Sequence, residues 1–369
     1  MFGGRLAQKG RDFALTVNFH KITPLVGIRW VLTPHPKIAI FWGMETLSQF
    51  DKQFGTDEQC RTFLAKMRWP DGVVKCPRCG HDKVFALAAR PYHWVCKSGK
   101  ESVDKATGQI LTCHKRNGYR FSVTTRTIFQ DTKIPLNLWF KVGYLMLTAK
   151  KGISALQIHR VMFGEQSGSD YHTSWFMCMR WRAAMAGDMF QPLSGEIEAD
   201  ETYIGGKDRN RHWNKKSAQV RAARGELAFG QEKFGYGKVG VIGAIARKGN
   251  VVARVIGSQD APTLAGFVRN VVDKGKVTLV ATDEKLDYNY VDGELPHQSV
   301  KHSQGEFVRG SVHTNNIESF WSLIKRGVVG QYHNVSKKYL PFYLNEFSFR
   351  FNNRNNPEMF ADLIATCAQ

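Results

Sequence analysis

The sequence predicts an α/β fold for its C-terminal half, preceded by a cysteine-rich segment and a short helical segment. Three patterns indicate this arrangement. Four of the seven cysteines gather between residues 76 and 113. Apolar residues recur at helical spacing between residues 131 and 190, and from residue 194 strand-like alternation leads into alternating strands and helices. With 43% hydrophobic and 23% charged residues, the 369-residue chain is neither disordered nor collagen-like.

Lysine and arginine outnumber acidic residues by 52 to 32, which gives a formal net charge of +20. Such an excess favours a nucleic acid or an anionic membrane as the partner. No membrane-spanning helix is expected, because even the apolar stretch over residues 22–42 is broken by prolines and charges. No secretory signal is expected, and seven cysteines are too few for a disulfide scaffold. We therefore expect a cytoplasmic protein that binds nucleic acid.

Residues 1–43 form a basic tail, with six lysines and arginines against the single acidic residue Asp12. Because this tail shows no sustained periodicity, an alternative is that translation begins at Met44. From Met44 to residue 70 the apolar residues follow a helical pattern. Thr56, with Gln59 three residues later, predicts a capping box at the start of a helix.

The pair Cys76 and Cys79 has the form of a zinc knuckle, since thiolates two residues apart can occupy adjacent corners of one tetrahedron. Cys96 follows Cys79 by 17 residues, and Cys113 follows Cys96 by the same interval. We expect these four cysteines to hold a structural zinc ion, with His114 as the alternative fourth ligand. The remaining alternative is that Cys96 and Cys113 are free thiols.

Residues 120–130 alternate and are rich in β-branched side chains, which predicts a strand. Helices are predicted over residues 136–150, 153–162 and 172–185. Short helices around a glycine-containing turn in a basic protein indicate a helix-turn-helix-like domain. A small helical packing domain is an equally good interpretation.

From residue 194 the predicted elements build an α/β layer. They are a strand over 195–206, a hairpin over 237–258, a helix over 264–272, a strand over 276–283, and helices over 314–328 and 337–354. Three carboxylates of this layer lie at positions where a metal site could form. Asp200 shares a strand face with Glu198 and Thr202, Asp283 ends the buried strand, and Glu318 lies early in a helix.

Carboxylates from two strands and one helix can hold two divalent cations for phosphoryl transfer. The hard oxygen ligands favour Mg²⁺ or Mn²⁺, and Lys325, two turns after Glu318, could hold a phosphate. Each position also has an ordinary alternative. Glu198 or Glu201 could replace Asp200, Asp283 could cap a turn, and Glu318 could form a capping box with Asn315.

Six motifs together carry a family resemblance: CPRCG, FSVTTRTIF, KKGISALQIHR, EADETYIGGK, VATDE and HTNNIESFWSLIKRG. From about Met44 to the C-terminus the chain resembles the DDE transposases of small bacterial insertion sequences, in the ISXO-like group with an N-terminal zinc ribbon. The resemblance implies an RNase H-like catalytic domain and carries the catalytic, metal-binding triad onto Asp200, Asp283 and Glu318. One departure is Arg126, which stands where the family usually has glycine.

The resemblance implies an enzyme that binds the element's terminal inverted repeats, cleaves double-stranded DNA and transfers the freed strand to target DNA. It also implies a homo-oligomeric synaptic complex at the bacterial nucleoid, with no membrane partner. A catalytically silent zinc-ribbon DNA-binding regulator is the alternative, and a metal-dependent nuclease without strand transfer is a third interpretation.

We expect four parts: a basic tail over 1–43, N-terminal helices and a zinc ribbon over 44–130, a helical DNA-binding domain over 131–192, and the catalytic domain with C-terminal helices over 193–369. Residues 207–248 carry eleven lysines and arginines against three acidic residues, which predicts a DNA-backbone clamp or a solvated loop. The expected DNA-binding residues are Lys325, Arg326, Lys207, Arg209, Arg211, Lys215 and Lys216.

Overall fold

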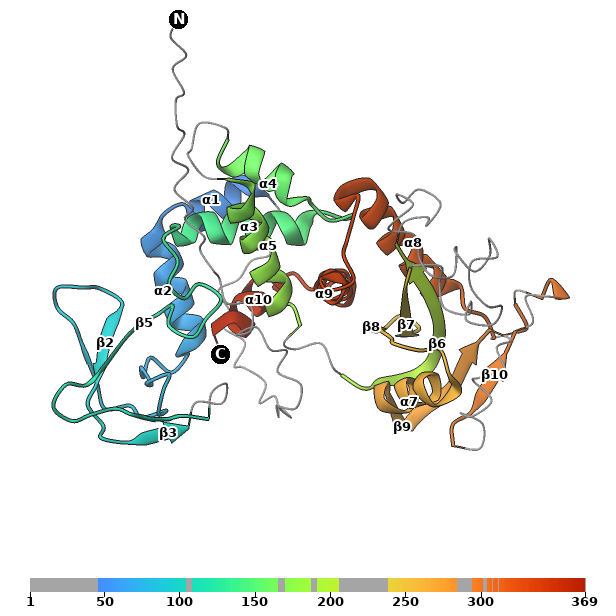
Figure 1. Ribbon diagram of the computed structural model, residues 1–369, viewed down its shortest axis with the longest axis horizontal. Helices are drawn as coiled ribbons and strands as arrows, with labels where there is room; N and C mark the ends of the chain where they lie inside the picture. The colour runs from blue at the N-terminus through green and yellow to red at the C-terminus, as the bar shows by residue number, and fades with distance from the viewer. Residues whose placement is uncertain are drawn as a thin grey trace, which may run out of the picture. The chain divides into compact units, whose positions relative to one another are not determined.

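The computed structural model describes residues 46–103, 108–164, 170–186, 191–205, 238–283, 294–300, 304–306, 308–310 and 312–368 (Figure 1). The tail over 1–43 lies outside the described residues, as do Lys207, Arg209, Arg211, Lys215 and Lys216. The described chain forms two compact units. One spans residues 74–121, and the other joins residues 46–73 to residues 122–368. Among the described residues, no helix combines the length and the apolar character needed to cross a membrane.

The smaller unit is built from short strands. β1 (Val84–Ala86) pairs antiparallel with β2 (His93–Cys96), and β2 also neighbours β5 (Tyr119–Ser122). β3 (Glu101–Val103) and β4 (Ile110–Thr112) form a separate antiparallel pair. Its apolar contacts include Trp94 stacked on Phe121, with ring centroids 5.8 Å apart. A unit this small needs a further source of stability, such as a metal.

The strand predicted over residues 120–130 is wrong beyond Ser122, where the chain enters a series of turns. Threonine hydroxyls cause the change, because they bond to nearby backbone groups and compete with strand pairing. The Thr125 hydroxyl accepts from the Ser122 N–H at 2.9 Å, and the Thr127 hydroxyl donates to the Thr124 carbonyl at 2.7 Å. Arg126, within these turns, has a φ of 62°.

The larger unit begins with α1 (Leu47–Phe54) and α2 (Asp57–Arg68), each opened by a threonine capping box. The box at Thr56 and Gln59 confirms the prediction. The three helices predicted before residue 190 are α3 (Leu136–Thr148), α4 (Ala155–Met162) and α5 (Tyr171–Ala184). The C-terminal helices α9 (Leu340–Asn352) and α10 (Met359–Ala368) pack on this bundle, α9 against α5 and α10 against α2, α3 and α5.

The sheet of the larger unit has five strands in the order β10-β9-β6-β7-β8. β6 (Leu193–Ile204), β7 (Val239–Ala246) and β8 (Val251–Val255) form an antiparallel meander. β9 (Val272–Thr282) pairs parallel with β6, and β10 (His297–Ser299) pairs parallel with β9. This mixed sheet with its flanking helices confirms the expected α/β layer. The sequence did not predict β10 or α10.

Helices cover the two faces of this sheet (Figure 1). α7 (Ala261–Val271) buries its apolar side against residues such as Ile197 and Ala199 of β6. α8 (Asn315–Gly327) packs on the opposite face and continues into the π-helical turn η8 (Val328–Tyr332). Its predicted apolar stripe is buried, as expected, at Ile317, Phe320, Trp321, Ile324 and Val328. One face of β6 therefore packs on α7, while Glu198 and Asp200 on the other face point toward α8.

Candidate active site and cysteine cluster

The four predicted cysteines meet in the smaller unit. The Sγ atoms of Cys76 and Cys113 are 3.9 Å apart, those of Cys79 and Cys96 are 3.7 Å apart, and all four lie within 4.8 Å of one another. Four thiolates around one zinc ion, each at about 2.3 Å, would be about 3.8 Å apart. The cluster therefore fits a tetrahedral zinc ion, and the alternative ligand His114 is exposed and outside it.

The turn that carries the first two cysteines is shaped by its backbone. Gly80 has a φ of 71° and donates its N–H to the Cys76 carbonyl at 2.8 Å. Burial works against ionisation of Cys79, but hydrogen bonds from Ser98 and from the His81 backbone lower its pKa to about 7. A thiol of this kind is ready to become the thiolate that zinc requires.

Two of the three predicted catalytic carboxylates meet at the boundary of β6 and β9. Glu198 of β6 is level with Ala281 of β9, so Asp200, two residues on, is level with Asp283 just past the end of β9. Oxygen atoms of Asp200, Asp283 and Glu201 all lie within 4.8 Å of one another. Because Mg²⁺ takes oxygen ligands at about 2.1 Å, a small adjustment would bring these groups onto a divalent cation.

Glu201, expected only as an alternative to Asp200, lies beside it in the cluster, although strand alternation puts neighbouring residues on opposite faces. Asp283 lies just past the end of β9, where the chain no longer pairs with β6. Its carboxylate can therefore approach Asp200 and Glu201, which lie on opposite faces of β6. Burial, together with the charges of Asp283 and Glu201, raises the pKa of Asp200 to about 7. A bound cation would relieve this crowding of negative charge.

The indole of Trp321 on α8 fixes the orientation of the Asp200 carboxylate. Its Nε1 donates a hydrogen bond to Asp200 Oδ2 at 3.1 Å. The ring comes this close because Gly243 of β7, the pairing partner of Asp200, has no side chain. A Cβ atom there would lie 2.6 Å from the indole.

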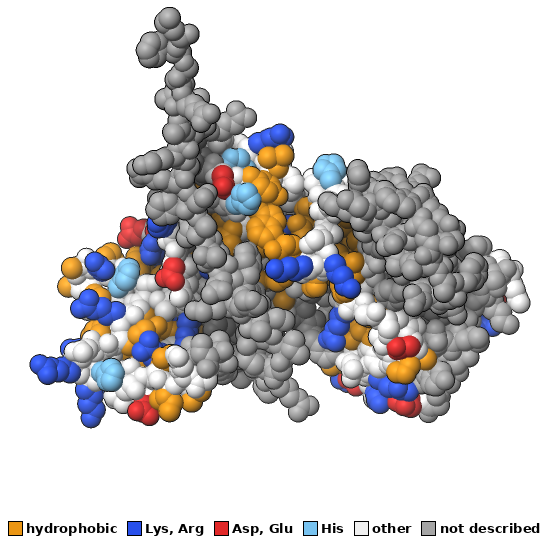
Figure 2. Space-filling view, viewed as in Figure 1, with side chains coloured by type: hydrophobic (Ala, Val, Ile, Leu, Met, Phe, Trp, Pro, Cys, Tyr) orange, Lys and Arg blue, Asp and Glu red, His pale blue; other side chains and the backbone are white. Residues whose placement is uncertain are grey.

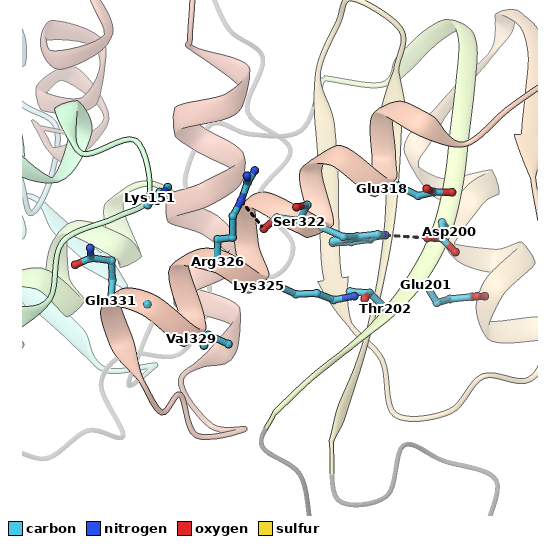
Figure 3. A pocket seen from close by; sticks show the side chains of 12 residues that line it. Lys151, Asp200, Glu201, Thr202, Glu318, Ser322, Lys325, Arg326, Val329 and Gln331 are labelled. Atoms are coloured by element: carbon cyan, nitrogen blue, oxygen red, sulfur yellow. Dashed lines mark hydrogen bonds between the residues drawn. The ribbon is translucent and has the colours of Figure 1, made fainter. Parts of the chain in front are cut away.

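The third predicted carboxylate, Glu318, stands in the first turn of α8. Its side chain is exposed and lines the same cavity as Asp200 and Glu201 (Figure 3), although it is not one of the three carboxylates that lie within 4.8 Å of one another. Thr314 Oγ1 donates to its Oε1 at 2.8 Å. The predicted alternative of a capping box with Asn315 is wrong, because the N-cap residue is Thr314 and no side chain of the helix caps it.

A carboxylate from the sheet takes over the capping of α8. Glu198 is fully buried, and its Oε2 accepts the backbone N–H groups of Asn316 at 2.8 Å and Ile317 at 3.1 Å. Its Oε1 accepts from the Asn316 side chain at 2.7 Å and from Arg247 Nε at 2.9 Å. A negative charge at a helix N-terminus also interacts favourably with the helix dipole. Glu198 thus fastens the start of α8 to β6, two residues from Asp200.

The cavity beside these carboxylates has a volume of about 900 Å³ and follows α8 (Figure 3). Two predicted DNA-binding residues, Lys325 and Arg326, line it, as does Lys151 from the turn between α3 and α4, which was not predicted. The other lining residues are Asp200, Glu201, Thr202, Glu318, Trp321, Ser322, Val329, Gly330 and Gln331. Lysine and arginine side chains are also prominent on the face drawn in Figure 2, in keeping with the net charge of +20.

Comparison with known proteins gives two family matches. Residues 55–100 match the transposase zinc-ribbon domain, and residues 192–352 match the ISXO2-like transposase domain. The first match ends before Cys113, which the fold brings to the cluster. The second contains Asp200, Asp283 and Glu318.

A relative from Halobacterium salinarum, described as an uncharacterized protein in transposable element ISH50, is 26% identical over 307 residues, covering 81% of this chain and 92% of the relative. A chain in the cryo-EM structure of the simian T-cell lymphotropic virus intasome with PP2A regulatory subunit B56 gamma is 10% identical, with a TM-score of 0.26 over 57% of this chain and 65% of that chain. A similarity this low supports no inference. The two family matches identify an N-terminal transposase zinc ribbon followed by an ISXO2-like DDE transposase domain, both of the IS1595 family.

Proposed function

We propose that this protein is the transposase of an insertion sequence, which binds the element's terminal inverted repeats and catalyses metal-dependent DNA cleavage and strand transfer. The catalytic residues in this proposal are Asp200, Asp283 and Glu318. The observation that carries it is the meeting of Asp200 and Asp283, 83 residues apart in sequence, beside a cavity that Glu318 and two basic residues of α8 also line.

Asp200 and Asp283, with Glu201 beside them and Glu318 across the cavity, would hold the divalent cations. Mg²⁺ or Mn²⁺ held by these residues would supply activation of the attacking oxygen and stabilisation of the leaving oxygen in an in-line displacement. In the first reaction water breaks a phosphodiester at the element end, leaving a 3′-hydroxyl and a 5′-phosphate. In the second that hydroxyl attacks a target phosphodiester, forms the new bond and releases a target 3′-hydroxyl.

The protein's own groups would position the DNA for both reactions. Trp321 holds the Asp200 carboxylate in place, and Lys325 and Arg326 lie on the cavity wall where DNA phosphates would be held. We assign sequence recognition to the zinc ribbon and to the helical DNA-binding domain over residues 131–192. The basic positions Lys207, Arg209, Arg211, Lys215 and Lys216 would add contacts to the DNA backbone.

Two element ends must be held together for transposition, so we propose a homo-oligomeric synaptic complex on double-stranded DNA. The site of action would be chromosomal DNA in a prokaryotic cytoplasm. The relative in a transposable element of an archaeon supports this setting, and widens the expected hosts beyond bacteria.

The test is cleavage of a labelled duplex taken from the DNA that flanks the coding sequence, with Mg²⁺ or Mn²⁺ and a supercoiled plasmid as target. We expect the wild type to nick the duplex at one position and to join its 3′ end to the plasmid. Asp283→Asn should abolish both products while DNA binding persists. Specific binding without cleavage by the wild type would instead support the silent regulator, and cleavage without joining would support a nuclease.

A further inference from the structure

The cavity beside the carboxylates is a groove that follows one side of α8. Glu318, Ser322 and Lys325 of α8 and Val329 of η8 line it at intervals of three and four residues, which places them along one side of the continuous helix. From Glu318 to Val329 the helix rises about 16 Å. Nucleotides of a B-form strand advance about 3.4 Å each along the axis, so the groove is long enough for four or five of them.

Lys151, on the turn between α3 and α4, lines the groove on the side away from the carboxylates (Figure 3). Two glycines allow this turn to press against α8 and η8. A Cβ atom on Gly152 would lie 1.9 Å from the Tyr332 hydroxyl, and one on Gly327 would lie 2.8 Å from the Lys151 carbonyl oxygen. The same turn is held by Arg350 of α9, whose guanidinium donates to the Ala149 carbonyl.

Tyr332, the residue that packs on Gly152, is itself anchored in the protein interior. Its hydroxyl donates to Glu346 at 3.0 Å, and Glu346 pairs with the buried Arg182 of α5 at 2.7 Å. The turn is therefore fastened to the same helices that support η8. The backbone position of Lys151 is thus fixed by packing and hydrogen bonds within the fold.

The charges along the groove are arranged in two groups. Asp200, Glu201 and Glu318 lie at one end, while Lys325, Arg326 and Lys151 line the wall beyond them. Within the part of the chain that the structure describes, neither Lys151 nor Lys325 forms an ion pair with an acidic side chain. Lysine side chains that form no ion pair here are available to bind DNA phosphates. Metal ions bound to the carboxylates would screen the negative charge of the DNA from that of the acidic cluster.

We propose that this groove binds the DNA strand that leads away from the cleaved phosphodiester, and that Lys151 holds one of its phosphates four or five nucleotides from the metal site. The proposal rests on the proposed function, since it takes the carboxylates as the cleavage site. It adds a substrate contact from the helical region to the catalytic pocket. The exposed Val329, 72% accessible in the groove wall, would lie against the sugars or bases of the same strand.

The test measures binding with no Mg²⁺ or Mn²⁺ added and no chelator present, so that no cleavage occurs and the zinc ribbon keeps its metal. The probe is the duplex that flanks the coding sequence, carrying one neutral methylphosphonate at a time. With the wild type, neutralising one particular phosphate should weaken binding about tenfold. Lys151→Ala should weaken binding to the unmodified duplex about tenfold. It should lower the slope of the logarithm of the binding constant against the logarithm of the salt concentration by about one, and its binding should no longer depend on the charge of that one phosphate. Lys151→Arg should restore the wild-type pattern.

Lys150→Ala is the matched control, because Lys150 is the neighbouring exposed lysine and is not among the residues that line the groove. It should keep the sensitivity at the one phosphate where Lys151→Ala loses it. Identical patterns for wild type and Lys151→Ala would overturn the inference, whatever the cleavage assay shows. If Lys151→Ala changes the pattern but the wild type cleaves no DNA, the groove contact stands and the proposed function fails.

Discussion

Replacing Glu198 with glutamine tests whether this carboxylate fastens α8 to the sheet. Both Glu198 oxygens face donors. Oε2 accepts the backbone N–H groups of Asn316 and Ile317, and Oε1 accepts from the side chains of Asn316 and Arg247, with His313 Nδ1 also 3.2 Å away. A glutamine amide would turn its NH₂ group toward two of these donors and leave Arg247 without its buried partner. Breaking a buried charged pair costs about 3–5 kcal/mol, so we expect a loss of that size.

The measurement is thermal or urea unfolding of Glu198→Gln beside the wild type. For a unit of this size, 3–5 kcal/mol corresponds to a decrease in Tm of roughly 6–20 °C. Glu196→Gln is the control, because Glu196 also pairs with Arg247 but is 42% exposed, and surface pairs contribute at most about 1 kcal/mol. If Glu198→Gln lost no more free energy of unfolding than Glu196→Gln, the capping argument would be refuted.

Three further predictions follow from single residues. Cys113→Ser should lower the zinc content and destabilise the smaller unit. Cys60→Ser should leave the zinc content unchanged, because Cys60 is a buried thiol of α2 outside the cluster; metal analysis of the purified proteins checks this. Because the pKa of Asp200 is raised from 3.8 to about 7, the metal-free fold binds an extra proton in that window and should lose stability as pH rises through it. Mg²⁺ should therefore raise the Tm more at pH 8 than at pH 6, and Asp200→Asn should show no such difference. Arg126→Gly should stabilise the protein by about 0.5–1 kcal/mol in urea unfolding, because φ at this residue is 62°. A loss of stability there would mean that the arginine side chain outweighs the backbone cost.

Local patterns predicted most of the helices and strands of this fold. Amphipathic spacing marked the buried face of α8, and a threonine followed by glutamine three residues later marked the start of α2. The hairpin of β7 and β8 followed from two apolar runs around a short polar turn. Each of these signals lies within a few residues of the chain, where periodicity and capping act.

Contacts between distant residues could not be predicted in the same way. Glu198 is 118 residues from Asn316, so its role as the cap of α8 becomes visible only when β6 and α8 are packed together. Glu201 joins the acidic cluster because β9 ends beside it, which is a matter of strand register. β10 has only three residues and owes its existence to pairing with β9, not to a pattern of its own.

The two ends of α8 are fixed by different parts of the protein, which gives this helix a defined role in the proposed site. Glu198 of the sheet holds its N-terminus, where Glu318 stands. The turn at Gly152 and the buried Tyr332–Glu346 contact hold its C-terminal end, beside which Lys325 and Lys151 line the groove. Because a helix has a fixed rise per residue, the spacing between the carboxylates and the basic wall proposed to bind phosphates is set by the helix itself. A change at either anchor should therefore misalign the DNA strand with the metal site, so that Glu198→Gln lowers the cleavage rate even at temperatures where the protein remains folded.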